Sequence, residues 1–139
     1  MTTGIPALLR RDVTTRAKGL CEYCLVPEQA SGFLHEIDHI VADQHGGLTE
    51  AENLALSCWR CNRQKGPNVG SFDPETGKLV PFYNPRQQVW IEHFRLECAV
   101  IQPLTAEGRV TVKILLVNDP RRVEERERLI AVGLYRPIE

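Results

Sequence analysis

Two Cys-x-x-Cys pairs, Cys21/Cys24 and Cys58/Cys61, constrain the fold of this chain more than any other feature. A Cys-x-x-Cys turn brings two thiolates close enough to share one tetrahedral ion, and two such turns complete a four-cysteine zinc site. The 33 residues between the pairs exceed the gap of a simple zinc ribbon. We therefore expect a structural Zn²⁺ that holds together the two ends of a sizeable insert.

Polar side chains that could take part in catalysis or metal binding lie inside this insert and directly after it. Asp38 and His39 lie inside the insert, in a stretch that alternates like a strand, and Asn62 comes immediately after Cys61. A helix starting near Trp59 would rotate Asn62 by about 100° from Cys61, so that its side chain points away from the zinc. Lys65, three residues later, would share the face of Asn62. The pattern predicts one helix that serves a structural ion on one side and a reactive site on the other.

The segment resembles the zinc-bound form of the HNH family of nucleases, in which four cysteines bind the zinc. The matching positions, taken in order, are Cys21, Cys24, Asp38-His39, Gly46-Gly47, Asn53-Leu54, Cys58, Cys61-Asn62 and Lys65-Gly66. This resemblance implies a ββα-metal fold and metal-dependent cleavage of the DNA backbone. The residues for which the family is named, His, Asn and His, correspond here to His39, Asn53 and Asn62. Many relatives have His where this chain has Asn62.

The same resemblance implies a role for each polar residue. His39 would be the general base, and Asp38 and Asn62 would hold the working ion. Their oxygens suit Mg²⁺ or Mn²⁺. Asn53 would fix the loop and His39 through backbone hydrogen bonds rather than contact substrate. The cations near the last cysteine suit phosphate contacts, with the best placed first: Lys65, Arg63 and Arg60.

Some assignments stay open at this stage. His39 could replace a cysteine in a zinc site of three cysteines and one histidine. Glu36 would share a strand face with Asp38, and it could bind the metal or be a solvated charge. The remaining histidines are expected to be structural or exposed: His35, His45 and His93. Cys98 has no evident partner, and we expect a buried free thiol.

Charge is an argument against simple DNA binding. The chain has a formal net charge of −1, and residues 1–70 hold seven Lys and Arg against eight Asp and Glu. Phosphate contacts normally call for clustered cations, and four thiolates on zinc would add two negative charges. No apolar leader follows the first residues, and the longest aliphatic run is Ile114 to Val117. We therefore expect a cytoplasmic protein without a membrane span.

Local patterns predict the order of elements along the chain. Capping residues, i to i+4 apolar spacing and alternation indicate helices at 5–18, from Trp59 to Gly66, 105–116 and 120–133, with strands at 34–40, 53–57, 79–83 and 89–94. The β-branched content of 105–116 leaves a strand as the alternative there. A Gly-, Pro- and Asp-rich connector at 69–78 is the best candidate for a boundary.

We therefore expect an α+β protein. Residues 1–70 would form a zinc-stapled ββα-metal core with an N-terminal helix, and residues 71–139 a C-terminal α/β extension packed on that core. The expected function is metal-dependent cleavage of DNA, with RNA as an alternative substrate. The alternative function is a non-catalytic zinc module that binds nucleic acid or a protein partner.

Overall fold

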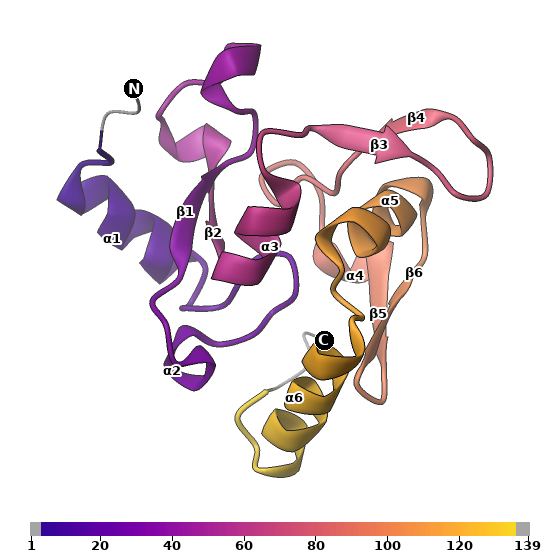
Figure 1. Ribbon diagram of the computed structural model, residues 1–139. Helices are drawn as coiled ribbons and strands as arrows, with labels where there is room; N and C mark the ends of the chain where they lie inside the picture. Colours follow the sequence, from indigo (N-terminus) through magenta and orange to yellow (C-terminus); the bar gives the residue numbers. More distant parts are fainter. Residues whose placement is uncertain (1–3, 136–139) are drawn as a thin grey trace.

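The N-terminal half of the protein contains a β-hairpin followed directly by a helix (Figure 1). The computed structural model describes residues 4–135. In this half the elements are α1 (Ala7–Arg16), α2 (Glu28–Ser31), β1 (Glu36–His39), the short 3₁₀ turns η1 (Asp43–His45) and η2 (Ala51–Asn53), β2 (Leu54–Ser57) and α3 (Trp59–Lys65). Strands β1 and β2 pair antiparallel, with Glu36 opposite Ser57 and His39 opposite Leu54. The expected β-β-α order is present.

The C-terminal half adds two further antiparallel hairpins and two longer helices. Its elements are β3 (Gly70–Phe72), β4 (Leu79–Pro81), α4 (Trp90–His93), β5 (Phe94–Glu97), β6 (Val100–Pro103), α5 (Ala106–Leu115) and α6 (Pro120–Ala131). The hairpins are β3–β4 and β5–β6, and α5 packs against both. With helices and strands in both halves, the fold is α+β, as the sequence predicted.

Residues at the N-terminal ends of α5 and α6 favour the start of a helix at each place. Thr105 accepts a hydrogen bond from Gly108 N–H, and Asp119 accepts one from Arg121 N–H, so each helix begins with a side-chain cap. Pro120 occupies the first turn of α6, where its missing N–H costs no hydrogen bond. The strand alternative for residues 105–116 is therefore wrong.

Two local expectations need correction. Residues 89–94 do not form a strand, because 90–93 are the short helix α4 and only Phe94 begins β5. Trp90 and Phe94 pack ring to ring, with centroids 5.0 Å apart, a contact that follows from i, i+4 spacing. Cys98 is a free thiol but exposed, not buried. It lies in the two-residue turn between β5 and β6, with φ 54°.

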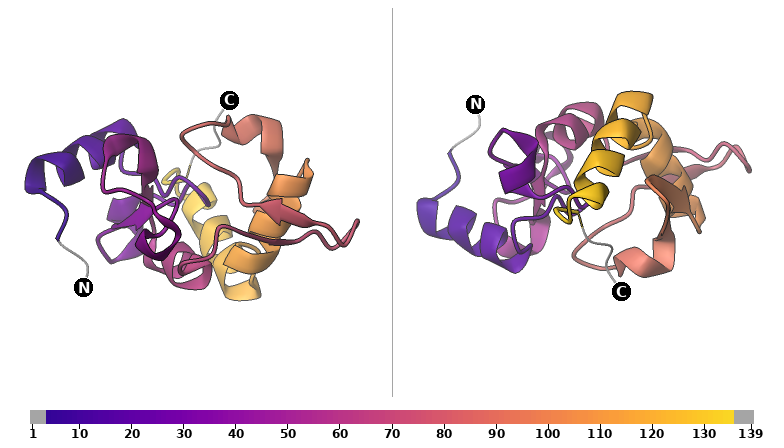
Figure 2. Two further views of the ribbon diagram at one scale, coloured as in Figure 1. Left: turned by 90° about the horizontal axis from the view of Figure 1, so that it is seen from above. Right: turned by 90° about the horizontal axis from the view of Figure 1, so that it is seen from below.

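One hydrophobic core spans both halves. It includes Tyr23 and Ala55 from the N-terminal half and Trp90, Phe94 and Ile101 from the C-terminal half. A smaller cluster of Val13, Leu54 and Leu56 attaches α1 to the hairpin. In both views of Figure 2, along the vertical axis of Figure 1, α6 is seen between the N-terminal half and the β5–β6 hairpin. The boundary expected near residue 70 is therefore crossed by shared packing.

Between residues 4 and 135, none of the helices has both the length and the apolar character needed to cross a bilayer.

Candidate metal centre and adjoining cleft

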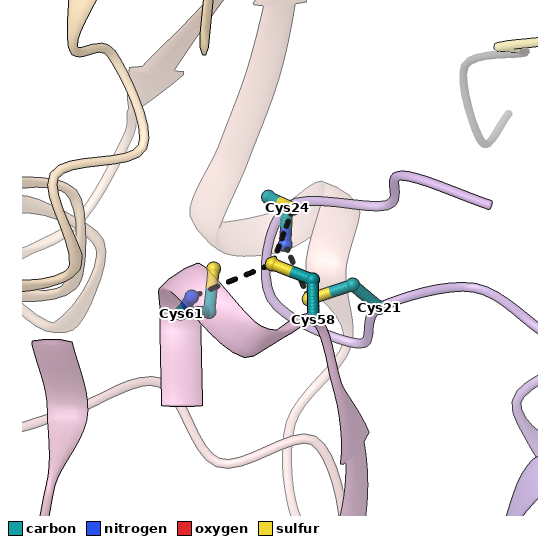
Figure 3. A group of neighbouring side chains, drawn as sticks. All are labelled: Cys21, Cys24, Cys58 and Cys61. Atoms are coloured by element: carbon teal, nitrogen blue, oxygen red, sulfur yellow. Dashed lines mark hydrogen bonds between the residues drawn. The ribbon is translucent and has the colours of Figure 1, made fainter. Parts of the chain in front are cut away.

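The four paired cysteines converge on one buried point between two short turns (Figure 3). Their sulfur atoms all lie within 4.8 Å of one another, and Cys24 Sγ is 3.8 Å from Cys58 Sγ. A tetrahedral zinc with Zn–S bonds of about 2.3 Å separates its sulfurs by about 3.8 Å. The four expected thiols are thus brought together in a geometry that fits a zinc ion.

Local backbone structure shapes this centre. Cys58 is the N-cap of α3 and accepts the Cys61 N–H at 3.4 Å, while Cys24 N–H points at Cys21 Sγ at 3.5 Å. Such N–H···S contacts stabilise thiolates. His39 does not enter the cluster, because the four cysteines complete it without a histidine. The alternative of three cysteines and one histidine is therefore wrong.

A buried arginine from α6 completes the surroundings of the centre. Arg122 is 7% exposed, and its Nη2 lies 3.0 Å from Cys61 Sγ and 3.8 Å from Cys58 Sγ. Its Nη1 donates to the carbonyls of Leu115 and Leu116. The guanidinium compensates part of the negative charge of four thiolates. Sequence reasoning missed this role. The only available signal was the spacing of Arg122, Arg126 and Leu129 on one helix face.

Asp38 lies in β1, beside the buried face of α3 that carries Cys61 and Lys65. It is 3% exposed. Tyr23 O–H donates to its Oδ2 at 2.7 Å, and Lys65 Nζ donates to its Oδ1 at 3.2 Å. Burial raises the pKa of the Asp38 carboxyl, and the Lys65 ammonium opposes that rise. The two donors keep the carboxylate oriented in an otherwise unfavourable environment.

Lys65 is inside the protein, which corrects the expectation that it faces a phosphate. It is 1% exposed, and its ammonium donates to Asp38 and to the carbonyls of His39 and Ile40 at 3.1 to 3.2 Å. These contacts use its three donors. The side chain does share the α3 face of Asn62, but the C-terminal end of β1 packs against that part of the face. Its ammonium therefore fixes β1 and is not available to substrate.

His39 is half-buried at the end of β1. Its Nε2 lies 2.9 Å from Thr49 Oγ1, so the ring is held by the loop between the two strands. Asn53 clamps that loop. Its Oδ1 accepts Val41 N–H, and its Nδ2 donates to the carbonyls of Val41 and Leu48, all at 2.9 Å. These are the backbone bonds expected of Asn53 from the sequence.

Gly47 allows the same loop to close tightly. A Cβ atom at this position would lie 1.7 Å from Val41 O and 2.8 Å from Asn53 Nδ2. Any larger residue would therefore displace the clamp. Gly46 has φ 89°, a conformation that glycine adopts without strain. Gly46 and Gly47 are thus the residues that this loop conformation requires.

Asn62 projects from α3 toward β1. Its Nδ2 donates to Glu36 Oε1 at 2.6 Å, and the Glu36 side chain is exposed. An open cleft of about 440 Å³ brings the key groups together, and its lining is Ile37, Asp38, His39, Ala42, Asp43, Gln44, Asn62, Gly66 and Pro67. Asp38, His39 and Asn62 therefore share one surface hollow, with Asn53 behind it. Carboxylate and amide oxygens there are of the type that hard divalent ions bind.

The other predicted cations and histidines lie outside this cleft. Arg60 pairs with Glu125 at 3.0 Å, and the guanidinium groups of Arg60 and Arg63 lie 5.4 and 5.3 Å from the ring centre of Trp59. Arg63 is exposed. His35 contacts the Val26 carbonyl and His93 contacts Thr105, while His45 is exposed in η1. These three histidines are structural or exposed, as expected.

Comparison with known families agrees with this geometry. The family model described as HNH endonuclease matches residues 21–68, about a third of the chain. The matched range starts at the first cysteine of the metal centre and ends just beyond α3. No curated protein and no solved structure matched the chain.

Proposed function

We propose that this protein is a metal-dependent endonuclease that hydrolyses DNA phosphodiester bonds, because residues 21–68 match the HNH endonuclease family model and contain a four-cysteine cluster that fits a metal ion. The observation that carries the proposal is the open cleft shared by Asp38, His39 and Asn62. Backbone hydrolysis needs an activated water, compensation of charge on the phosphate and help for the leaving oxygen. A base and two oxygen ligands around one hollow provide the protein's part of this chemistry. The products would be a 5′-phosphate and a 3′-hydroxyl, as the family resemblance implies.

His39 is the proposed general base, acting through Nδ1. With Nε2–H donating to Thr49 Oγ1, Nδ1 keeps its lone pair. Among residues 4–135 no hydrogen bond occupies Nδ1. The imidazole would accept a proton from the water that attacks phosphorus. Asn53 supports this role indirectly, because it holds the loop that carries Thr49.

Asp38 and Asn62 are the proposed ligands of the working ion. When bound, Mg²⁺ or Mn²⁺ supplies compensation of negative charge at the phosphate and the leaving oxygen. Each Asp38 oxygen accepts one bond, from Tyr23 or Lys65. A carboxylate has about four lone-pair sites, so each oxygen keeps acceptor capacity for an ion.

Arg63 and Arg60 are the proposed nucleic-acid contacts. Arg63 is exposed on α3, next in sequence to Asn62, and its contact with Trp59 leaves its N–H donors open to phosphate. Arg60 is partly engaged by Glu125, so its contribution should be smaller. Lys65 has no part in this contact, because its ammonium is buried against Asp38.

The direct test is incubation of supercoiled plasmid with the zinc-loaded protein in Mg²⁺, in Mn²⁺ and without a divalent ion. We expect nicking and linearisation only where a divalent ion is present. His39→Ala should retain zinc and lower the rate by roughly 10²–10⁴-fold, the usual loss for a positioned base. Full activity of His39→Ala would overturn the assignment of the base.

Asn62→Ala separates ligand from base in the same assay. Its loss of activity should be partly recovered at higher Mg²⁺ or Mn²⁺ concentration, because the side chain is assigned to holding the ion. His39→Ala should show no such recovery. An equal response of the two variants to metal concentration would contradict the division of roles.

The second candidate function is a non-catalytic zinc module that binds nucleic acid or a protein. The observation in its favour is charge, since the chain is slightly acidic and the Lys65 cation is buried in an ion pair. Binding of DNA or RNA without cleavage in any of the metal conditions would support this module and oppose the nuclease.

A further inference from the structure

Tyr23 connects the zinc centre to the cleft. It lies between Cys21 and Cys24 in the sequence, and its ring is 1% exposed. Its hydroxyl reaches across to Asp38 Oδ2 at 2.7 Å. The first cysteine turn therefore supplies one of the two side-chain donors to Asp38.

The second donor comes from the other zinc turn. Lys65 follows Cys61 by one turn of α3, and its Nζ donates to Asp38 Oδ1 at 3.2 Å. Each oxygen of Asp38 is thus held by an element that begins at a pair of cysteines. Both cysteine turns therefore contribute a donor to the same carboxylate.

We propose that Tyr23, together with Lys65, is a positioning residue that orients Asp38 for the working divalent ion, so that the zinc centre sets the geometry of the cleft. This inference rests on the proposed nuclease function. Tyr23 does not touch the substrate or the ion in this role. It acts through Asp38, as hydrogen-bonded partners of metal-binding carboxylates commonly do.

The phenol is well suited to this task because its own position is fixed. The Tyr23 carbonyl accepts the indole N–H of Trp90 at 3.0 Å, and the following residue, Cys24, points its N–H at Cys21 Sγ. The ring is packed in the main hydrophobic core. A hydroxyl on such a rigid side chain holds one carboxylate oxygen of Asp38, a residue that also lines the cleft, in place.

Tyr23→Phe is the decisive variant, because it removes the hydroxyl and keeps the ring. Mn²⁺ binding is measured by calorimetry in zinc-loaded protein carrying His39→Ala, which separates ion binding from cleavage. We expect Mn²⁺ to bind about 10-fold more weakly with Tyr23→Phe, within the usual range for loss of such a partner. In protein that retains His39, Tyr23→Phe should raise the Mg²⁺ concentration for half-maximal cleavage by about the same factor. The maximal rate should change much less.

Tyr83→Phe is the matched control. Tyr83 is also buried, but its hydroxyl points to the Gln88 carbonyl at 3.5 Å and does not contact Asp38. It should leave Mn²⁺ binding unchanged. Trp90→Phe gives a second test that keeps Asp38 and the Tyr23 hydroxyl, because it removes the donor to the Tyr23 carbonyl together with part of a buried ring. It should weaken Mn²⁺ binding in the same direction by a smaller factor.

The outcomes separate this inference from the proposed function. Unchanged Mn²⁺ affinity and unchanged Mg²⁺ dependence in zinc-loaded Tyr23→Phe would overturn the positioning role, while the nuclease would stand if wild type cleaves. Equal weakening by Tyr83→Phe would also overturn it, because the effect would then be a general one of a lost buried hydroxyl. A wild-type protein that neither binds Mn²⁺ nor cleaves DNA would overturn both proposals.

Discussion

Lys65 and Asn62 lie on the same side of α3, but one is buried and the other lines the cleft. Asn62 lines the open cleft, whereas Lys65 is buried beneath it. Helical spacing places both on one side of α3, and the packing of β1 then decides which of them meets solvent. The Lys65 ammonium balances the buried charge of Asp38. Removal of either partner would leave an unpaired buried charge, which is strongly destabilising.

The buried tyrosines give a prediction about pH. Burial raises the pKa of Tyr23, Tyr83 and Tyr135 above the ordinary value. A pKa that is higher in the folded than in the unfolded protein stabilises the fold below about pH 10, and that contribution is lost as pH rises through the folded pKa. In an ultraviolet titration of the zinc-loaded protein, tyrosinate should therefore appear well above pH 10 and together with unfolding.

The urea-unfolded protein is the control for that titration, and its tyrosines should ionise near pH 10. Ionisation of even one tyrosine at its ordinary pKa in the folded protein would contradict the described packing. Tyr135 is the most informative case, because its hydroxyl donates to the Cys24 carbonyl beside the zinc centre.

Helix α6 has one buried face and one exposed face, and both carry arginines. Arg122 and Arg126 point inward, where Arg126 donates to the carbonyls of Ala99 and Val117. Arg121 and Arg128 are exposed. The two inner arginines of this helix serve as buried donors. One of them, Arg122, faces the metal centre.

We predict that Arg122→Gln weakens zinc retention. Loss of the guanidinium leaves the negative charge of four thiolates less compensated, and loss of such a neighbour typically lowers metal affinity about 10–100-fold. Competition with a chromophoric chelator measures the change. Arg121→Gln is the matched control on the exposed side of the same helix, and it should leave zinc affinity unchanged. Equal zinc affinity in both variants would show that Arg122 is only a packing residue.

At the level of the complete molecule, the C-terminal half supports the zinc turns from several directions. Trp90 contacts the Tyr23 carbonyl, Arg122 contacts Cys61, and Tyr135 contacts the Cys24 carbonyl. These contacts belong to a hydrophobic core that spans both halves. The segment 71–139 is therefore expected to be part of the folding unit.

A fragment of residues 1–70 provides the test. We predict that it fails to reach a stable native structure even with zinc, because it would expose the apolar side chains that the C-terminal half covers and would lack Arg122 beside the thiolates. Dispersion of amide signals by NMR and the cooperativity of thermal unfolding measure this against the full chain. A cooperatively folded, zinc-loaded fragment would show that residues 1–70 are an independent domain.

Local features of the sequence determined much of this protein. The zinc ligands, the β-β-α order and the starts of α5 and α6 follow from short-range spacing, capping residues and turns, whose physics acts within a few residues. The Asn53 clamp was also foreseeable from its place in the motif. Residues 89–94 were misassigned because a short apolar run fits helix and strand alike.

Only the tertiary structure decided the environment of the ionisable groups. The sequence does not distinguish Arg122 from Arg121, or show that Tyr23 meets Asp38, because these contacts join residues 15 to 64 positions apart. Lys65 was expected in solvent for the same reason. A side chain's role as ligand, buried donor or substrate contact depends on which distant segment packs against it, and that is a property of the folded chain.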